Sequence, residues 1–482
     1  MKIWISEPAY AYDAKTLLHA LYKGQEILVD MVKESSDWSI DCRDDFLLVE
    51  SPWGSREVRW NEEGSCFYRS FSGDRKKREK FAFKHLVYNL YLEGGGAPLP
   101  WGVLTGIRPT KIVLEHLREG SLDTLGEVLA RNYRISPEKI RLLEEIAAAE
   151  QEVLQGGEPE DMSVYVGIPF CPTRCLYCSF TAYPMAKNRH LARPYVDALV
   201  REVGETRELW SGKAGKRIRS LYIGGGTPTA LDEEDLEHLL EKLSALLPWE
   251  GLEEITVEAG RPDTITREKL EILRKYGIHR ISINPQTMNQ KTLDRIGREH
   301  TVRDVEETFR MAREMGFDRI NMDLILGLSG EGLEEVRHTF REVEKLAPDN
   351  LTVHTLAVKR ASRLKEEEDL QEFPGEDKVA AMVEIAREAA REMGLAPYYM
   401  YRQKNMVGSH ENIGYARPGT ACVYNVVVME EVQTVLAYGA GAITKVVHPR
   451  ENRIERIENV KNLEQYLERI QEMIDRKMEY FL

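Results

Sequence analysis

The sequence lacks any long apolar run and any recognisable targeting segment. No stretch of its 482 residues approaches the ~18 uninterrupted apolar side chains that a membrane-crossing helix needs. The first residues, Met1 to Tyr10, have neither the pattern of a signal peptide nor that of an arginine-rich transit peptide. We therefore expect a cytoplasmic protein without a membrane span.

Basic charge is also in short supply. The chain carries 66 lysines and arginines against 80 aspartates and glutamates, which gives a formal net charge of −14. An acidic surface repels phosphate backbones, so the composition argues against a nucleic-acid partner. Hydrophobic residues make up 42% and charged residues 30%, which is the balance of a folded globular protein. The length is too great for one ordinary core, so we expect two or three domains.

Cysteine is scarce, with six in the whole chain. Without a secretory signal, a disulfide framework is not expected. Cys42, Cys66 and Cys422 are scattered, and we interpret them as small buried hydrophobic residues. The other three cysteines lie within eight residues of one another and need a separate explanation.

The clustered cysteines form the motif Cys-x3-Cys-x2-Cys, at Cys171, Cys175 and Cys178. Three thiolates on one short loop can bind three irons of a [4Fe–4S] cubane and leave the fourth iron open. S-adenosylmethionine (SAM) can chelate that iron, and an electron from the cluster then cleaves SAM to a 5′-deoxyadenosyl radical. A structural zinc site is the alternative, but it needs four ligands and no second cysteine pair follows. The aromatic Tyr177 favours the radical SAM interpretation, because that position commonly flanks the adenine in such enzymes.

The amino-terminal third divides into a β-rich domain, residues 1–75, and a helical connecting region, residues 76–160. Ser136 and Pro137 have the order of an N-cap followed by proline at the first helical position. The strands are expected at Glu26–Asp30, Phe46–Ser51 and Ser55–Trp60, and the helices near 80–92, 109–118, 122–132 and 137–154.

Strands and helices alternate from 161 to 375. Six such alternations predict an α/β fold with a parallel sheet, which curls into a full or partial barrel with its chemistry at the carboxyl ends of the strands. The strands are expected at Ser163–Ile168, Ser220–Ile223, Glu254–Val257, Arg280–Ile283, Arg319–Ile325 and Asn350–Thr355. The helices between them are expected at 193–210, 232–246, 266–276, 302–315 and 331–346.

The last segment, 376–482, forms a further unit in this interpretation. It contains a helix near 376–394, a strand at Ala396–Tyr401 and a helix at 462–478. Its small residues at 437–442 suggest close packing against another part of the chain.

Polar residues follow the predicted strands at the barrel's carboxyl end. The turn Gly224–Thr227 lets the backbone approach a ligand closely, here the SAM ammonium group. Glu258 can hold a pair of ribose hydroxyls, and Gln286 offers an amide to SAM; exposed surface residues are the alternative for both. Asp323 interrupts an apolar strand, which is costly unless the carboxylate is paired or functional. Arg298 is its ion-pair partner, a residue that holds a ligand carboxylate, or a solvated side chain.

Together these motifs resemble the oxygen-independent coproporphyrinogen III oxidase (dehydrogenase) family. The resemblance covers about residues 161–360 and extends more loosely to about 445. Segments 100–111 and 410–415 resemble a variant branch of this family with a long amino-terminal extension. The fold that it implies is a partial (β/α)6 radical SAM barrel, with an α+β amino-terminal extension and a small α+β carboxy-terminal domain that covers the substrate. The resemblance rests on Tyr165–Cys171, Cys175–Phe180, Gly224–Thr229, Glu258, Gln286, Arg298 and Asp323–Leu328.

The resemblance also implies roles for individual residues. The three clustered cysteines would hold the [4Fe–4S] cluster and act through it in catalysis. Tyr165, Gly225 and Glu258 would contact SAM. Family members can bind a second SAM, and the positions that match its site are Tyr177, Gly226, Thr227, Gln286, Arg298 and Asp323.

The reaction that the resemblance implies is oxidative decarboxylation of two propionates of coproporphyrinogen III, which gives protoporphyrinogen IX in haem biosynthesis. A tetrapyrrole substrate and a reducing electron donor such as flavodoxin or ferredoxin are the implied partners. We expect the protein to be a monomer.

Two positions depart from the family pattern. Gly167 stands where the family usually has histidine, and Asn284-Pro285 stands where it has Gly-Val. The first change removes a titratable group near the cluster, and the second changes backbone freedom near the second SAM site. Both leave the substrate open, so the alternatives are a haem-delivery protein, a radical methyltransferase and an anaerobic haem-degrading enzyme. Candidate propionate partners are Lys359, Arg360, Arg402, Lys404 and Arg417, and candidate haem ligands are His354, His410 and Cys422.

Overall fold

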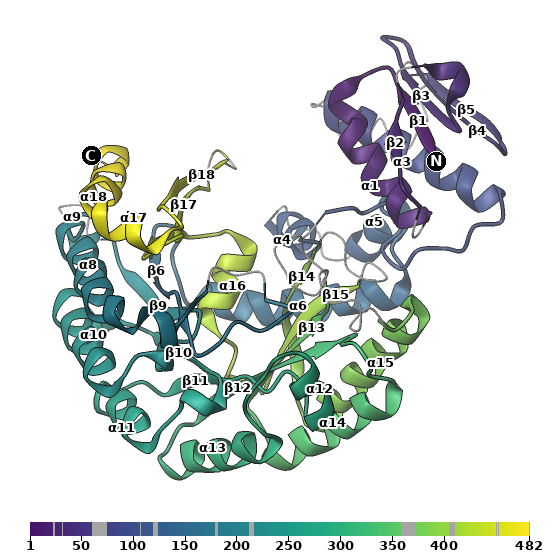
Figure 1. Cartoon of the computed structure of the whole chain (residues 1–482). Helices are drawn as coiled ribbons and strands as arrows, with labels where there is room; N and C mark the ends of the chain where they lie inside the picture. Colours follow the sequence, from purple (N-terminus) through teal and green to yellow (C-terminus); the bar gives the residue numbers. More distant parts are fainter. Residues whose placement is uncertain are drawn as a thin grey trace. The chain divides into compact units, whose positions relative to one another are not determined.

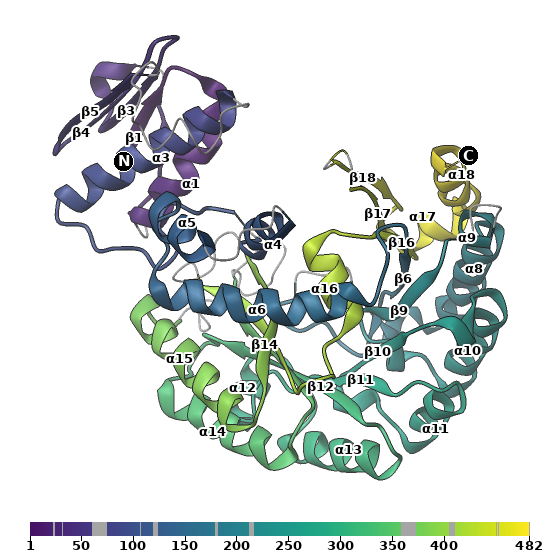
Figure 2. The same ribbon diagram turned by 180° about the vertical axis from the view of Figure 1, so that it is seen from behind.

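The computed structural model describes residues 1–22, 25–30, 32–59, 75–106, 108–118, 124–178, 182–211, 216–357, 373–403, 410–449, 451 and 453–481 (Figure 1). The chain forms two compact units, Met1–Glu144 and Glu145–Leu482, and each has a sheet of its own. Figure 2 shows the same elements from behind.

The first unit is built on a five-stranded mixed sheet with the strand order β2-β1-β3-β4-β5. Strand β1 is parallel to β2 and β3, whereas β3, β4 and β5 are antiparallel to one another. Helices α1 and α3 share one apolar core with these strands. The bounds are β1 Lys2–Ile5, α1 Ala11–Leu21, β2 Leu28–Val29, β3 Trp38–Cys42, β4 Phe46–Ser51, β5 Gly54–Arg59 and α3 Arg75–Glu93.

The expected strands of this unit are present, with β2 shorter than expected and β5 described as far as Arg59. Helix α1 was not expected from the sequence, and its buried side chains Leu17 and Leu18 belong to the core. The expected boundary at 75/76 falls at the start of α3, whose Phe83 lies in the same core as the strands. Cys42 is partly buried against this core, and Cys66 lies outside the described residues.

Three more helices follow where the sequence predicts them. Helix α6 begins at Pro137, and the backbone N–H of Lys139 lies 3.4 Å from Ser136 Oγ, so Ser136 occupies the capping position as expected. The bounds are α4 Thr110–Arg118, α5 Leu125–Asn132 and α6 Pro137–Gln155.

The second unit is organised by an eleven-stranded sheet, in the order β14-β15-β13-β12-β11-β10-β9-β6-β16-β17-β18. The six strands expected from the sequence are consecutive neighbours in it and all parallel. Their near-continuous apolar sequences fit strands that are buried on both faces. Since β6 and β13 do not pair, the barrel is partial, as expected. The bounds are β6 Met162–Ile168, β9 Ile218–Gly225, β10 Glu254–Gly260, β11 Arg280–Ile283, β12 Arg319–Leu326 and β13 Asn350–Thr355.

The helices between these strands form an arc on the outside of the curved sheet (Figure 1). Each turns an apolar face to the strands, and α13 begins with a capping box between Thr301 and Asp304. No helix among the described residues combines the length and apolar character needed to cross a membrane. The bounds are α8 Ala192–Glu205, α9 Glu208–Ser211, α10 Glu233–Leu246, α11 Arg267–Lys275, α12 Gln290–Arg295, α13 Val302–Glu314 and α14 Leu333–Leu346.

The carboxy-terminal residues extend the same sheet at both edges. On one side β15 is antiparallel to β13 and β14, and on the other β16 is parallel to β6, with β17 and β18 antiparallel beyond it. Residues 376–482 therefore contribute strands to the barrel's sheet, and the division of the chain into four segments stays a prediction. The bounds are α15 Glu376–Glu392, β14 Ala396–Arg402, β15 Glu411–Ala416, α16 Val423–Glu430, β16 Thr434–Tyr438, β17 Ile443–His448, β18 Arg453–Glu458, α17 Leu463–Glu468 and α18 Ile470–Phe481.

A buried polar network ties this carboxy-terminal segment to the strand before the cysteines. Tyr195 donates a hydrogen bond to Gly167 O at 2.5 Å, and a Cβ on Gly439 would lie 2.4 Å from the same hydroxyl. Glu202 accepts hydrogen bonds from Gly439 N at 3.0 Å and from Lys477 Nζ at 2.6 Å. The small-residue segment is thus closely packed, as expected, and its Gly439 packs against Gly167 at the end of β6.

Candidate functional site

A cavity of about 350 Å³ lies at the carboxyl ends of the parallel strands. All twelve residues that the sequence singled out for the cluster and SAM contribute to its wall, although they come from positions as far apart as 165 and 323. They are Tyr165, Cys171, Cys175, Tyr177, Cys178, Gly225, Gly226, Thr227, Glu258, Gln286, Arg298 and Asp323.

The cysteine loop, residues 171–178, is anchored at both its start and its middle. Phe170 O, just before the first cysteine, accepts a hydrogen bond from Thr227 N at 2.7 Å. In the middle of the loop, Arg261 Nη1 donates to Thr173 Oγ1 at 2.6 Å. Two neighbouring strand ends therefore hold the loop before any ligand binds, which lowers the entropic cost of gathering the thiols.

The three thiols belong to the wall of the cavity. Cys175 is buried, and Cys171 and Cys178 are partly exposed. Burial raises the pKa of the Cys171 thiol to about 11, against a lowering contact with Thr227 Oγ1 at 3.5 Å. No three His, Cys, Asp or Glu side chains in the described part of the chain converge on a single ion. A [4Fe–4S] cubane does not need three side chains to converge on one ion, because each thiolate binds a different iron. The loop therefore fits a cluster held by three thiolates.

The glycine turn after β9 lies directly against the start of the cysteine loop. Gly226 N donates to Ile168 O at 2.8 Å, and a Cβ on Gly226 would lie 2.5 Å from Phe170 O, so only glycine fits there. Gly225 has a φ of +108°, a conformation that side-chain-bearing residues rarely adopt. The turn therefore offers bare backbone at the cavity wall, as the sequence suggests for a close-approaching ligand.

Glu258 reaches across to this turn from the end of β10. Its two oxygens accept hydrogen bonds from Tyr222 Oη at 2.5 Å and from Gly225 N at 3.0 Å. Burial raises the pKa of this carboxyl to about 7, although the hydrogen bonds lower it. Tyr222 in turn stacks on Tyr165, with ring centroids 6.3 Å apart. A carboxylate with a perturbed pKa in a cavity is typical of a functional group.

Gln286 is held in an unusual backbone conformation. Its φ is +72°, which is uncommon for a residue other than glycine. Its N–H donates to Asp323 O, and its carbonyl accepts from Ile325 N, both at 2.9 Å. Asn284, where the sequence departs from the family pattern, is fixed by its N–H to Gly260 O at 2.7 Å. The surroundings thus hold the strained residue in place, which is common at ligand sites.

Arg298 is almost completely buried, with 6% of its surface exposed. Its Nη2 donates to Tyr177 Oη at 3.0 Å, while its Nε and Nη1 have no hydrogen-bond partner among the described residues. Asp323 instead accepts from Asn321 Nδ2 at 2.8 Å and lies 4.0 Å from His354 Nε2. Of the three roles that the sequence left open for Arg298, the ion pair with Asp323 and the solvated side chain do not fit, because Arg298 is buried and donates to Tyr177. A buried cation with unused donors suits a ligand carboxylate.

Several residues that the sequence did not assign to SAM also line the cavity. Arg261 follows β10 directly, so a charge at a strand end was a signal that could have found it. Tyr401 and Asn412 come from β14 and β15, whose antiparallel pairing no local pattern reveals. The further polar residues in the wall are Thr173, Arg174, Asn284, His354, Thr355 and Gln403.

The candidates for propionate and haem binding differ in whether they lie at the cavity. Arg417 donates its N–H to Asp349 O just before β13, at the opposite end of the sheet, so its proposed place at the substrate is wrong. Arg402 is described but does not line the cavity, and Lys359, Arg360 and Lys404 lie outside the described residues. Of the three haem-ligand candidates, His354 lines the cavity, whereas Cys422 is buried beside Glu254 at the other end of the barrel.

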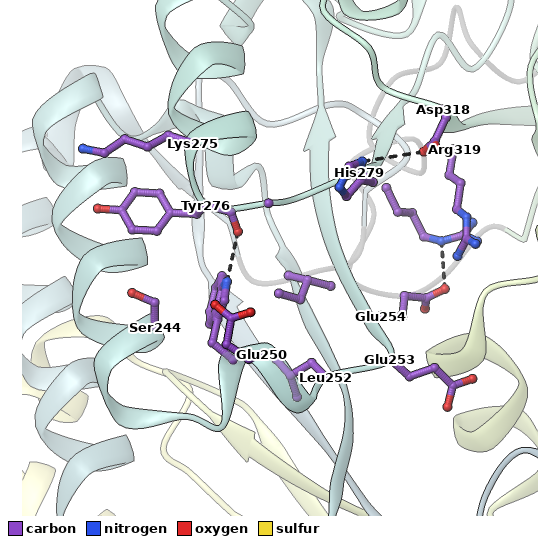
Figure 3. Close-up of a pocket in the computed structure, with 14 residues that line it drawn as sticks. Ser244, Glu250, Leu252, Glu253, Glu254, Lys275, Tyr276, His279, Asp318 and Arg319 are labelled. Carbon is purple, nitrogen blue, oxygen red and sulfur yellow. Dashed lines mark hydrogen bonds and ion pairs between the residues drawn. The ribbon is translucent and has the colours of Figure 1, made fainter.

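A second cavity, of about 700 Å³, lies at the amino ends of β10, β11 and β12 (Figure 3). The polar groups that surround it are largely paired with one another. Arg280 Nε lies 2.9 Å from Glu254 Oε2, Trp249 Nε1 donates to Tyr276 O at 3.0 Å, and a dashed line in Figure 3 joins His279 to Asp318. Two residues that the sequence offered as ligand partners, Cys422 and Arg417, lie at this end of the sheet.

Comparison with known proteins identifies the chain's relatives. The radical SAM superfamily model matches residues 165–343. The "oxygen-independent coproporphyrinogen-III oxidase-like protein HemZ" of Bacillus subtilis (strain 168) is 41% identical over 421 residues, which is 85% of this chain and 83% of that protein. The "heme chaperone HemW" of the same organism is 32% identical over 285 residues, 58% of this chain and 70% of that protein.

Among solved structures, coproporphyrinogen III oxidase (HemN) from Escherichia coli, a radical SAM enzyme, is similar with a TM-score of 0.53 and 24% identity. The match covers 68% of this chain and 73% of that one, and it supports the fold. The chain therefore belongs to the radical SAM family of oxygen-independent coproporphyrinogen III oxidase-like proteins, whose members use a [4Fe–4S] cluster and SAM.

Proposed function

We propose that this radical SAM enzyme catalyses the oxygen-independent decarboxylation of two propionates of coproporphyrinogen III, giving protoporphyrinogen IX. The observation that carries the proposal is that the residues expected to hold the cluster and SAM line one cavity together with cationic side chains, in a chain 41% identical to a coproporphyrinogen oxidase-like protein. Each propionate loses a β-hydrogen, its carboxylate leaves as carbon dioxide, and one electron passes to an acceptor, so that a vinyl group remains.

Cys171, Cys175 and Cys178 would hold the cluster in this proposal. When bound, the cluster and SAM supply a low-potential electron and the radical that abstracts hydrogen. Thr227 and Arg261 fix the loop that carries these thiols, through the hydrogen bonds to Phe170 O and Thr173 Oγ1.

The other wall residues would hold SAM. Gly225 and Gly226 would let its amino acid part approach the backbone, and Glu258 would accept hydrogen bonds from its ribose hydroxyls; all three line the cavity. The unused donors of Arg298 suit a carboxylate, which SAM and the substrate both carry. Gln286 and Asp323 would belong to the site of a second SAM.

The test is an anaerobic assay of the reconstituted protein. With a strong reductant, SAM and coproporphyrinogen III, we expect 5′-deoxyadenosine, carbon dioxide and a tetrapyrrole that carries two vinyl groups. Mass spectrometry of the oxidised products separates the one-vinyl from the two-vinyl compound. If 5′-deoxyadenosine forms and the tetrapyrrole is unchanged, the decarboxylase proposal fails.

A second candidate function, haem delivery, is favoured by one observation, the 32% identity to a protein named heme chaperone HemW. Stoichiometric binding of haem by the metal-free chain, seen as a Soret band, would support this candidate. Absence of that band together with vinyl formation would exclude it.

A further inference from the structure

We propose that His354 is a substrate-binding residue, held in place by Tyr401, that donates a hydrogen bond to a propionate carboxylate of the tetrapyrrole. The inference rests on the proposed function, because it names the part of the cavity that receives the substrate.

The location of His354 separates it from the residues expected to bind the first SAM. Tyr165, Gly225 and Glu258 belong to β6, β9 and β10, whereas His354 lies on β13, three strands beyond β10 in the sheet. In register, His354 stands next to Ile325 of β12, so its side chain enters the cavity beside that strand. About 29% of the His354 side chain remains exposed. This wall is therefore open to a ligand other than the first SAM.

Tyr401 orients the imidazole. Its hydroxyl lies 3.3 Å from His354 Nδ1, and Gln403 Nε2 donates to the same hydroxyl at 3.5 Å. Because the Tyr401 hydroxyl accepts a hydrogen bond from the Gln403 amide, it is free to donate its own O–H to His354 Nδ1. In that tautomer the proton of the neutral imidazole is on Nε2. The two rings meet edge to face, with their centroids 6.5 Å apart, and this contact limits rotation of the imidazole.

The charge on this wall explains why a carboxylate would need a donor here. Asp323 Oδ2 lies 4.0 Å from His354 Nε2, which is beyond hydrogen-bond distance. A propionate that enters alongside would be repelled by Asp323 unless a donor compensated the two negative charges. Among the described residues that β12 to β15 contribute to the cavity wall, His354 alone can carry a positive charge. The cationic side chains Arg174, Arg261 and Arg298 lie on the other side of the cavity, so a tetrapyrrole with four carboxylates needs a separate donor on this wall.

The experiment compares two probes on the cluster- and SAM-loaded protein. Coproporphyrin III is a stable, iron-free relative of the substrate with four free carboxylates, and its tetramethyl ester has the same ring without them. Fluorescence titration in one detergent-containing buffer gives both dissociation constants. Since neither probe contains iron, ligation of haem iron by His354 cannot contribute to the result.

We expect His354→Leu, which removes the N–H donor, to weaken binding of the free acid about tenfold, which is the scale of one hydrogen bond to a charged group. Binding of the ester should change less than twofold. Tyr401→Phe, which keeps the ring and removes the hydroxyl, should weaken the acid by a smaller factor in the same direction. The matched control is His279→Leu, at a histidine of the cavity at the opposite end of the sheet, which should change neither constant.

Three results would overturn the inference: equal losses for acid and ester, no loss for either, or wild-type protein that binds neither probe. Its failure is distinguishable from failure of the proposed function. If wild-type protein forms vinyl groups and His354→Leu keeps the same KM for coproporphyrinogen, the inference alone fails. If the acid binds in a manner that depends on His354 but no vinyl group forms, the decarboxylation alone fails.

Discussion

The two ends of one set of strands use charge in opposite ways. Strands β10, β11 and β12 have a cavity at each end, and each cavity receives acidic and basic side chains from them. At the amino end, Arg280 and Glu254 form a buried ion pair with 2.9 Å between Arg280 Nε and Glu254 Oε2, and Arg280 also donates to Asn350 Oδ1 and to Thr420 O, both at 2.7 Å. The charges at this end therefore stabilise the sheet.

At the carboxyl end the charges are left partly unused. Arg298 is as deeply buried as a core residue, yet two of its nitrogens have no hydrogen-bond partner among the described residues. The pKa of Glu258 is raised to about 7 by burial, so its ionised form is poorly compensated by the protein. Burying a charge without full compensation costs stability, and such groups are kept where a ligand completes them. The difference therefore points to the carboxyl end as the working end.

The largest expected effect comes from removing one thiol at the carboxyl end. In Cys175→Ala, two thiolates cannot hold the cubane, so the visible absorption of the reconstituted cluster and reductive SAM cleavage should both be abolished. The matched control is Cys422→Ser, which alters a buried cysteine that donates to Glu254 Oε1 at the amino end. That variant should assemble the cluster normally. A Cys175→Ala protein that still cleaves SAM would contradict the assignment of the cluster to the carboxyl end of the strands.

The second prediction contrasts the two buried arginines. Arg280→Met leaves Glu254 buried and uncompensated, which should cost about 3–5 kcal/mol of unfolding free energy. Arg298→Met removes a guanidinium that has one hydrogen-bond partner, so it should cost far less stability while weakening SAM or substrate binding. Hydrogen exchange of the β10 and β11 amides measures the first effect, and ligand titration measures the second.

Equal losses of stability in the two arginine variants would contradict this contrast, since both buried arginines would then stabilise the fold to the same extent. The double variant Arg280→Met with Glu254→Leu serves as control. Because it removes both charges, it should regain much of the stability that the single substitution loses.

What the sequence predicted depends on how local each signal is. The six parallel strands are short apolar runs, and the cysteine motif and the glycine turn are each continuous in sequence, so all could be recognised from their own residues. Helix α1 was not predicted, although its buried residues Ala14, Leu17, Leu18 and Leu21 recur at helical spacing. The pairing of β16 beside β6, and of β15 beside β13, joins segments far apart in the chain, and no single segment encodes it.

The same limit applies to the site. Tyr165 to Asp323 were found because each residue follows or lies within a recognisable strand. His354 and Tyr401 acquire their relation only when β13 and β14 are placed on either side of β15. Tyr177 was not considered as a partner of Arg298 for the same reason, because only the folded loop brings the two side chains together.

The third prediction concerns pH. The pKa of Glu258 is about 7 in the folded chain against an ordinary value of 4.5, so the folded state binds its proton more tightly than the unfolded state. Stability should therefore fall as pH rises from about 4.5 to about 7, by about 3 kcal/mol at most. Glu258→Gln cannot ionise and should flatten this slope. Hydrogen exchange of the metal-free protein at pH 5 and pH 7.5 checks it, and an unchanged slope in the variant would assign the pH dependence to other groups.

The smallest effect is expected at the amino-end cavity. Trp249→Phe keeps an aromatic ring and removes the indole N–H that donates to Tyr276 O (Figure 3). Loss of this single hydrogen bond should cost about 1 kcal/mol of unfolding free energy, because the freed carbonyl lies near the surface and can turn to water. SAM cleavage and tetrapyrrole turnover should be unchanged, because this cavity lies at the opposite end of the strands from the cysteines. Tyr165→Phe is the counterpart at the carboxyl end: it too removes one polar hydrogen from an aromatic ring, but it does so at the SAM wall and should raise the KM for SAM. If Trp249→Phe lowered turnover as much as Tyr165→Phe did, the amino-end cavity would have to be a working site, and paired charge would no longer distinguish the two ends.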